Sequence, residues 1–254
     1  MLAAERQRFL DDYLRIRRAE GRGSDDPAYY LALPFRDLSG KFEEQWAMRA
    51  RTYRGFEKCL PPGALDILDL GAGCGWLSYR LKLLGHFPVA VDILDDDHDG
   101  LRAARHYPYF HRVEAEFDRL PFPDRSFDAA VFNASLHYSP DYVKTLTETK
   151  RCVRPSGRIF VLDSPIYKRR EHGEMMRRER RQQFLAQYGT ESDHVKSIEY
   201  LDEDTLSKLS RQVGIEWLSY LPWYGWAWHL RPLKAWWSRS RPPSRFRILE
   251  GEVL

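Results

Sequence analysis

The sequence predicts an α/β protein with a Rossmann-like, doubly wound sheet of seven mostly parallel strands, helices on both faces and helical additions. Three observations lead to this class. Short apolar runs alternate with segments of helical apolar spacing from residue 65 onward. A glycine-rich loop follows the first apolar run directly. No apolar run approaches the roughly 18 residues that a membrane-spanning helix needs.

The region before the glycine loop is predicted to be helical. Residues 1–22 carry apolar side chains at near-helical spacing, and glycines follow them. A loop with two prolines is expected over residues 23–38, and a second helix over residues 39–60. We therefore expect residues 1–60 to form a helical cap on a Rossmann-like domain that spans residues 61–254.

The rest of the chain alternates between the two kinds of element. Strands are expected at residues 65–70, 88–91, near 113, and at 127–133, 158–163, 215–221 and 246–253. Helices are expected at residues 76–84, 100–107, 142–152 and 201–213, and a turn at 155–157. Helical insertions are expected at about residues 166–200 and 222–245. This order of strand and helix is the one that parallel pairing requires.

Composition limits the function. The 254 residues include 40 Lys and Arg and 37 Asp and Glu, a net charge of +3, so a nucleic-acid partner is not expected from charge alone. Three scattered cysteines form neither a disulfide framework nor a Cys-x-x-Cys zinc motif, and no metal site is predicted. The first 18 residues carry charges where a signal peptide is apolar, which predicts a cytoplasmic protein.

The glycine loop is the most informative segment. Gly71, Gly73 and Gly75 directly follow an apolar strand, so the backbone can turn tightly and approach a nucleotide-like ligand. In the dinucleotide fingerprint G-x-G-x-x-G, the third glycine would fall at Trp76, where an indole obstructs a pyrophosphate. No Gly-Lys-Ser/Thr is present either, so the loop is not a P-loop.

Two carboxylates flank this loop. Asp69 ends the first strand and can hold a cationic or amino-bearing ligand. Asp92 ends the second strand, 21 residues after Gly71, where it can accept hydrogen bonds from ribose hydroxyls. Together they fit an adenosine that carries an amino acid in place of a pyrophosphate.

Four blocks in a fixed order then point to one family. They read ILDLGAGCG, AVDI, EFDRLPFPDRSFDAAVFNASLHY and RPSGRIFVLD, and they span residues 65–163. In these blocks the sequence resembles the class I S-adenosylmethionine-dependent methyltransferases, in particular the subgroup that acts on small molecules. The resemblance implies S-adenosyl-L-methionine as the cofactor.

The resemblance also assigns the cofactor site. It carries over to Asp69, Gly71, Ala72, Gly73, Asp92, Ile93, Glu116, Phe117, Asn133 and Ala134. The family usually has Gly-Asp-Ala where this chain has Ala115-Glu116-Phe117, so Glu116 would accept the hydrogen bond from the adenine amino group. Asp118 takes that role if the alignment shifts by two residues.

Candidates for the acceptor side follow from position. His137, four residues after Asn133, is the candidate general base, because an unperturbed histidine titrates near neutral pH. The alternative is that His137 and Tyr138 only form a wall of the pocket. Trp46 and Tyr53, on the helix before the first strand, are candidate substrate contacts. Arg49 or Tyr53 could reach the methionine carboxylate, although the same spacing suits a simple packing helix.

The sequence narrows the chemical class of the methyl acceptor only in part. Asn133 is not followed by the prolines of amino-adenine methylases, so we expect a small aromatic or lipophilic acceptor and a monomer or homodimer. Six of the eight tryptophans lie between residues 217 and 237, and the Trp-rich, basic segment 222–241 suits either peripheral membrane contact or packing on the domain. The alternatives are an RNA or protein acceptor, suggested by the Arg-rich insertion, and a non-catalytic membrane-peripheral protein that keeps the fold.

Overall fold

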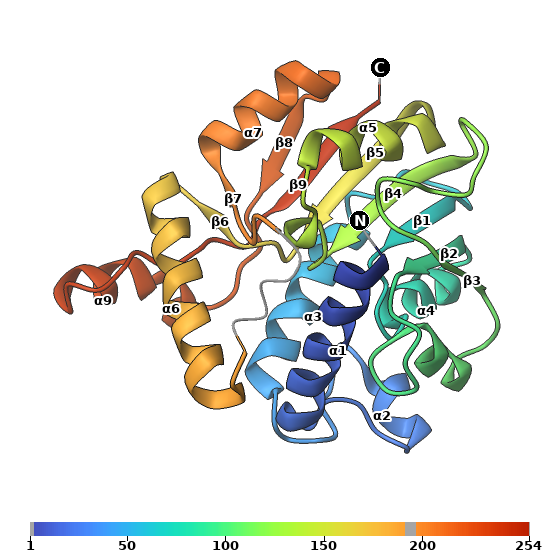
Figure 1. Ribbon diagram of the computed structural model, residues 1–254. Helices are drawn as coiled ribbons and strands as arrows, with labels where there is room; N and C mark the ends of the chain where they lie inside the picture. The colour runs from blue at the N-terminus through green and yellow to red at the C-terminus, as the bar shows by residue number, and fades with distance from the viewer. Residues whose placement is uncertain (1–2, 191–196, 254) are drawn as a thin grey trace.

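The protein's architecture comes from a computed structural model, which describes residues 3–190 and 197–253. A seven-stranded sheet has the order β3-β2-β1-β4-β5-β9-β8 (Figure 1). Its strands are β1 (Asp66–Leu70), β2 (Phe87–Asp92), β3 (His111–Glu114), β4 (Phe127–Asn133), β5 (Val153–Leu162), β8 (Trp217–Tyr220) and β9 (Ile248–Glu252). The first five strands are parallel, and β9 is antiparallel to both β5 and β8. The predicted fold class is confirmed.

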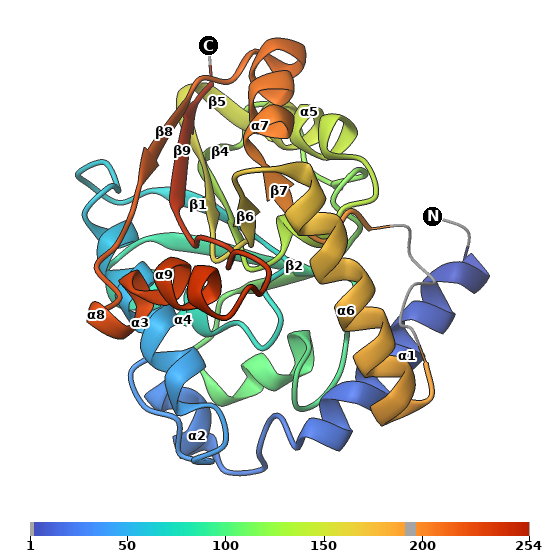
Figure 2. The same cartoon turned by 90° about the vertical axis from the view of Figure 1, so that its left-hand side faces the viewer.

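Helices cover both faces of the sheet. They are α1 (Ala3–Glu20), α2 (Pro27–Ala32), α3 (Glu43–Glu57), α4 (Trp76–Leu83), α5 (Tyr142–Cys152), α6 (Arg170–Tyr188), α7 (Glu203–Leu209), α8 (Trp226–His229) and α9 (Arg231–Trp237). A small parallel pair joins β6 (Ile166–Tyr167) and β7 (Leu201–Asp202). Helix α6 runs beside α1, and α9 projects from the body (Figures 1 and 2). No helix within the described ranges is long and apolar enough to cross a membrane.

The sheet forms because its central strands are apolar on both sides. On β1, Ile67 packs into one buried cluster with Phe56 of α3 and Leu81 of α4. Leu68 packs into the opposite cluster with Leu146 of α5. Strands buried on both faces read as continuous apolar runs, which is why the sequence pattern located them.

Four local expectations differ from the structure. The loop expected over residues 23–38 contains α2, because the side chain of Asp26 accepts a hydrogen bond from the Ala28 N–H at 2.9 Å. The helix expected over residues 100–107 is a single 3₁₀ helix, Leu101–His106. The turn expected at residues 155–157 lies inside β5, at a bulge where the register with β4 shifts. The helix expected from residue 201 begins only after β7, where Asp202 caps α7.

Candidate functional site

The glycine loop joins β1 to α4 at the carboxyl edge of the sheet. Gly71, Gly73 and Gly75 have φ values of +75°, +53° and +79°, a region that favours glycine. A Cβ atom on Gly71 would lie 2.3 Å from Cβ of Ser135 in the loop after β4. Because the Ser135 hydroxyl is itself fixed to the Leu70 carbonyl at 2.5 Å, that space cannot open easily. The alternation of glycines thus serves both backbone turning and close approach.

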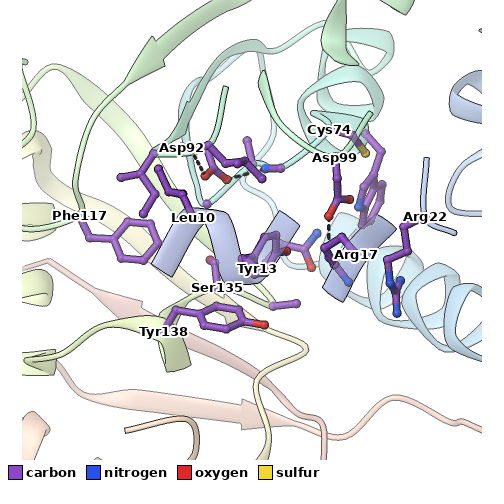
Figure 3. Close-up of a pocket in the computed structure, with 18 of the residues that line it drawn as sticks. Leu10, Tyr13, Arg17, Arg22, Cys74, Asp92, Asp99, Phe117, Ser135 and Tyr138 are labelled. Carbon is purple, nitrogen blue, oxygen red and sulfur yellow. Dashed lines mark hydrogen bonds and ion pairs between the residues drawn. The ribbon is translucent and has the colours of Figure 1, made fainter. Parts of the chain in front are cut away.

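A pocket opens beside this loop (Figure 3). The loops after β1, β2 and β4 line it, together with residues 116–118, α3 and α1. Its lining includes most of the predicted cofactor residues, namely Gly71, Ala72, Gly73, Asp92, Ile93, Glu116, Phe117, Asn133 and Ala134. The structure therefore brings together residues that are up to 63 positions apart in the sequence.

Asp92 lies at the end of β2 and points into the pocket (Figure 3). Its Oδ2 accepts a hydrogen bond from the Gly73 N–H at 2.8 Å, and its Oδ1 accepts one from the Leu94 N–H at 2.9 Å. Burial raises the pKa of Asp92 to about 6, although these backbone bonds oppose the shift. The carboxylate is therefore held rigidly against the glycine loop, ready to accept further hydrogen bonds from a polar ligand.

Asp69 lies elsewhere. It is fully buried and does not line the pocket; its Oδ2 accepts a hydrogen bond from the Ser78 hydroxyl of α4 at 2.7 Å. Its Oδ1 has no hydrogen-bond partner within the described part of the chain. Burial raises the pKa of Asp69 to about 7. In this position Asp69 ties β1 to α4.

Residues 116–118 form another wall of the pocket. The ring of Phe117 meets that of Phe132 edge to face at 5.6 Å. Asp118 forms an ion pair with Lys144 at 2.6 Å, and Glu116 lies 3.9 Å from a guanidinium nitrogen of Arg6 on α1. Both candidates for the adenine contact thus line the same cavity.

Helix α3 contributes two side chains, Trp46 and Arg49, to the lining. Trp46 is buried, and its Nε1 lacks a hydrogen-bond acceptor among the described residues. The guanidinium of Arg49 lies 4.8 Å from the centre of the Trp46 ring. Tyr53, two turns further along, is buried against Trp76 and Phe35 and does not line the pocket.

Helix α1 closes the pocket from outside the sheet. Phe9, Leu10, Tyr13 and Arg17 line the cavity from one face of this helix (Figure 3). The rings of Tyr13 and Tyr138 meet edge to face at 6.3 Å. The sequence places these residues in a cap but gives no sign that they line the site, although Phe9, Tyr13 and Ile16 recur at near-helical spacing.

Tyr138 lines the pocket, but His137 does not. The Nδ1 atom of His137 lies 3.3 Å from the Ser164 hydroxyl, and its carbonyl accepts the Glu199 N–H at 2.8 Å. Burial, with Arg180 and Arg49 nearby, lowers the pKa of His137 to about 3. A group with that pKa is a weak base near neutral pH, so this geometry gives no support to His137 as the general base.

The fold and the pocket define a class: a Rossmann-like domain in which a glycine-rich strand-loop-helix turn and the acid at the end of the second strand line one pocket. The model of a methyltransferase domain matches residues 68–161. An uncharacterized methyltransferase of Mycobacterium tuberculosis is 32% identical over 166 residues, which cover 64% of this chain and 61% of that relative. A ubiquinone/menaquinone biosynthesis C-methyltransferase of Vibrio cholerae is 34% identical over 104 residues, 38% of this chain and 40% of the relative.

A solved structure shares the fold. The 1,6-didemethyltoxoflavin-N1-methyltransferase of Burkholderia thailandensis, bound to its substrate and S-adenosylhomocysteine, superposes with a TM-score of 0.52 at 17% identity. The alignment covers 81% of this chain and 77% of that one. Residues 68–161 thus carry a methyltransferase domain, and the fold is the one found in S-adenosylmethionine-dependent methyltransferases. Its matched part spans about three fifths of the mycobacterial relative.

Proposed function

We propose that this protein transfers a methyl group from S-adenosylmethionine to a small, aromatic or lipophilic acceptor. One observation carries the proposal. Asp92 lines the pocket, and its hydrogen bond from the Gly73 N–H holds it against the glycine loop. A carboxylate in that position suits ribose hydroxyls, and the loop leaves no space-filling side chain where the amino-acid part of the cofactor must lie.

The residues on the other side of the pocket fit the amino-acid end of this cofactor. Trp46 carries a buried N–H with no acceptor in the described chain, and Arg49 lines the cavity beside it. A carboxylate would satisfy both donors, because a buried donor without a partner is costly. We therefore assign Arg49 and Trp46 to the methionine carboxylate, and Glu116, Phe117 and Ile93 to the adenine.

When bound, the cofactor supplies an activated methyl group on a positively charged sulfur. The protein's contribution is alignment and exclusion of water. Phe9, Leu10 and Tyr13 of α1 cover the pocket with apolar surface. Residues 3–57 thus act as the cap, and Asn133 and Ala134 border the place of the departing methyl group.

The lining favours a lipophilic acceptor. Aromatic side chains line the cavity from several separate elements, and they include Tyr13, Tyr29, Trp46, Phe117 and Tyr138. The Vibrio relative is named for quinone methylation and the Burkholderia neighbour for methylation of a heteroaromatic compound. The Arg-rich insertion suggested an RNA acceptor. One of its arginines, Arg180 of α6, instead forms an ion pair inside the protein, with Glu199 at 2.7 Å.

Calorimetry with S-adenosylhomocysteine tests the proposal. Wild type should bind the product, and Asp92→Ala should weaken binding by about 1–3 kcal/mol through loss of charge-assisted hydrogen bonds. Arg49→Met should weaken binding comparably, whereas Tyr53→Phe, on the same helix but outside the pocket, should bind as wild type does. Wild type that binds NAD but not S-adenosylhomocysteine would overturn the proposal.

A further inference from the structure

Residues 222–241, called here the tryptophan segment, have two apolar faces. The segment contains α8 and α9, and side chains three or four positions apart share a helical face. Tyr224, Trp228, Arg231 and Ala235 make up the inner face, which packs on the protein. Trp226, Leu230, Leu233 and Trp237 make up the outer face, with Trp223 and Trp236 beside it.

The inner face is firmly attached to the rest of the molecule. The buried Tyr224 hydroxyl lies 2.8 Å from the Thr52 hydroxyl of α3, and the Tyr224 carbonyl accepts a hydrogen bond from Arg51. Trp228 stacks on Phe246, with ring centres 5.4 Å apart, and Arg231 donates to the Ser244 carbonyl at 2.8 Å. The segment is therefore an ordered part of the fold. Its inner face makes these contacts with the rest of the protein, and the outer face is not needed for them.

The outer face is exposed to an unusual degree. The side chains of Trp226, Trp236 and Trp237 are 75%, 75% and 83% exposed. Trp223, Leu230 and Leu233 are each more than half exposed. Figure 1 shows α9 standing out from the sheet and its covering helices. A contiguous set of large apolar side chains on an ordered surface marks an interaction site.

Apart from the ion pair at its end, where Arg241 meets Glu179 of α6 at 2.9 Å, the charge on this segment has one sign. The sequence has no Asp or Glu from Trp217 to Leu249. Lys234 and Arg239 are exposed and form no ion pair with any described residue. Tryptophans surrounded by unpaired cations match the headgroup region of a bilayer with anionic lipids, where indoles are enriched and cations meet phosphates.

We propose that the tryptophan segment docks the protein peripherally on a bilayer that contains anionic lipids. The charge argues against a second copy of the chain as the occupant, because a two-fold contact would bring the cations of both copies together. The short helices α8 and α9 lie in the interface plane, with their outer face in the headgroup region. The inference does not depend on the proposed methyl transfer.

The placement also brings the membrane close to the pocket. Helix α3 holds Tyr224 through Arg51 and Thr52, and one turn earlier it contributes Trp46 and Arg49 to the pocket. A bilayer on the outer face of the tryptophan segment would thus lie near the α3 side of the cavity.

Cosedimentation with sized vesicles tests this inference. The vesicles are phosphatidylcholine alone, or phosphatidylcholine with a third of phosphatidylglycerol. We expect wild type to bind the anionic vesicles about tenfold more strongly than the neutral ones. Trp236→Ser/Trp237→Ser should lose about tenfold in binding, whereas the control Leu83→Ser/Tyr109→Ser, which removes exposed apolar side chains elsewhere, should bind as wild type does. Lys234→Gln/Arg239→Gln should bind the anionic vesicles only as well as the neutral ones.

Three results would overturn the inference: wild type that stays in the supernatant, a tryptophan variant that sediments like wild type, or a stable dimer that this variant dissolves. The last result, measured by light scattering, would assign the outer face to a second copy. Binding of S-adenosylhomocysteine by each variant serves as the folding control. Because α8 and α9 contribute nothing to the pocket lining, this binding should not change.

Discussion

Arg17 and Asp99 form an ion pair between α1 and the loop after β2, with 2.5 Å between Nε and Oδ2 (Figure 3). Both residues line the pocket, and both side chains are largely shielded from solvent. Arg18 reaches Asp96 of the same loop at 3.3 Å, and Arg6 reaches Glu114 at 3.1 Å. Helix α1 is therefore fastened along its length to the loops that border the cavity.

Removal of the Arg17 side chain should loosen this cap. Arg17→Met leaves Asp99 partly buried without its partner, which is costly for a charge. We expect the affinity for S-adenosylhomocysteine to fall about tenfold and α1 to be cleaved faster in limited proteolysis. Arg8→Met, an exposed position on the same helix, is the control and should change neither. Equal behaviour of the two variants would show that the ion pair does not hold the cap.

A comparison of Gly71 with Gly63 separates the steric effect of an added Cβ atom from the effect of a positive φ. Gly71 and Gly63 both have positive φ, but an added Cβ meets Ser135 at 2.3 Å in the first case and nothing within 4 Å in the second. Gly63→Ala should cost only about 1–2 kcal/mol in the free energy of unfolding, the penalty for an L-residue in the left-handed region. Gly71→Ala should cost more and abolish binding of S-adenosylhomocysteine. Urea unfolding measures the stability of each variant, and calorimetry measures its affinity for S-adenosylhomocysteine. Similar losses in the two variants would argue against a role for the Ser135 contact.

Binding should depend on pH through Asp92. Burial raises the pKa of this carboxyl to about 6, so it is ionised above that pH and protonated below it. A protonated acid is a weaker acceptor for ribose hydroxyls, so affinity for S-adenosylhomocysteine should decline as pH falls from 7.5 to 5. Asp92→Asn should bind weakly and with no such dependence. A dependence that persists in the Asn variant would assign it to another group.

Asp69 should affect stability instead. Its native pKa of about 7 exceeds the ordinary value of 3.8, so the native state binds the proton more tightly than the unfolded state does. The stabilisation that this bound proton gives the native state is full below about pH 4 and is lost as pH rises through about 7. As pH rises from 5 to 8, wild type should therefore lose about 2 kcal/mol in free energy of unfolding relative to Asp69→Asn. The exposed Asp97→Asn is the control, and an unchanged difference across this range would contradict the prediction.

The positions of the seven strands of the main sheet and of the glycine loop were predictable because their causes are local. Short apolar runs such as residues 66–70 and 127–133, with segments of helical apolar spacing after them, indicate buried strands. The positive φ of the glycine loop and the acid at the end of β2 also depend on short stretches of chain. For the same reason, nine of the ten residues predicted for the cofactor line the pocket and Asp69 does not, whereas Tyr53 and His137, predicted for the acceptor side, also lie outside the lining.

Other features depend on contacts between distant segments, and only the tertiary structure decided them. The bulge in β5, where the register with β4 shifts, is absent from any periodicity. Whether Asp69 faces a ligand or a helix, and whether His137 meets solvent or Ser164, depends on neighbours far away in sequence.

By itself the sequence determined the sheet, the glycine loop and the family's cofactor pattern, because backbone conformation and apolar periodicity act over a few residues. Only the packing of α1 and α3 over the sheet decided that Arg17, Trp46 and Arg49 face the pocket while Tyr53 does not. It also decided that one face of the tryptophan segment is anchored and the other exposed, since burial is a property of the assembled surface.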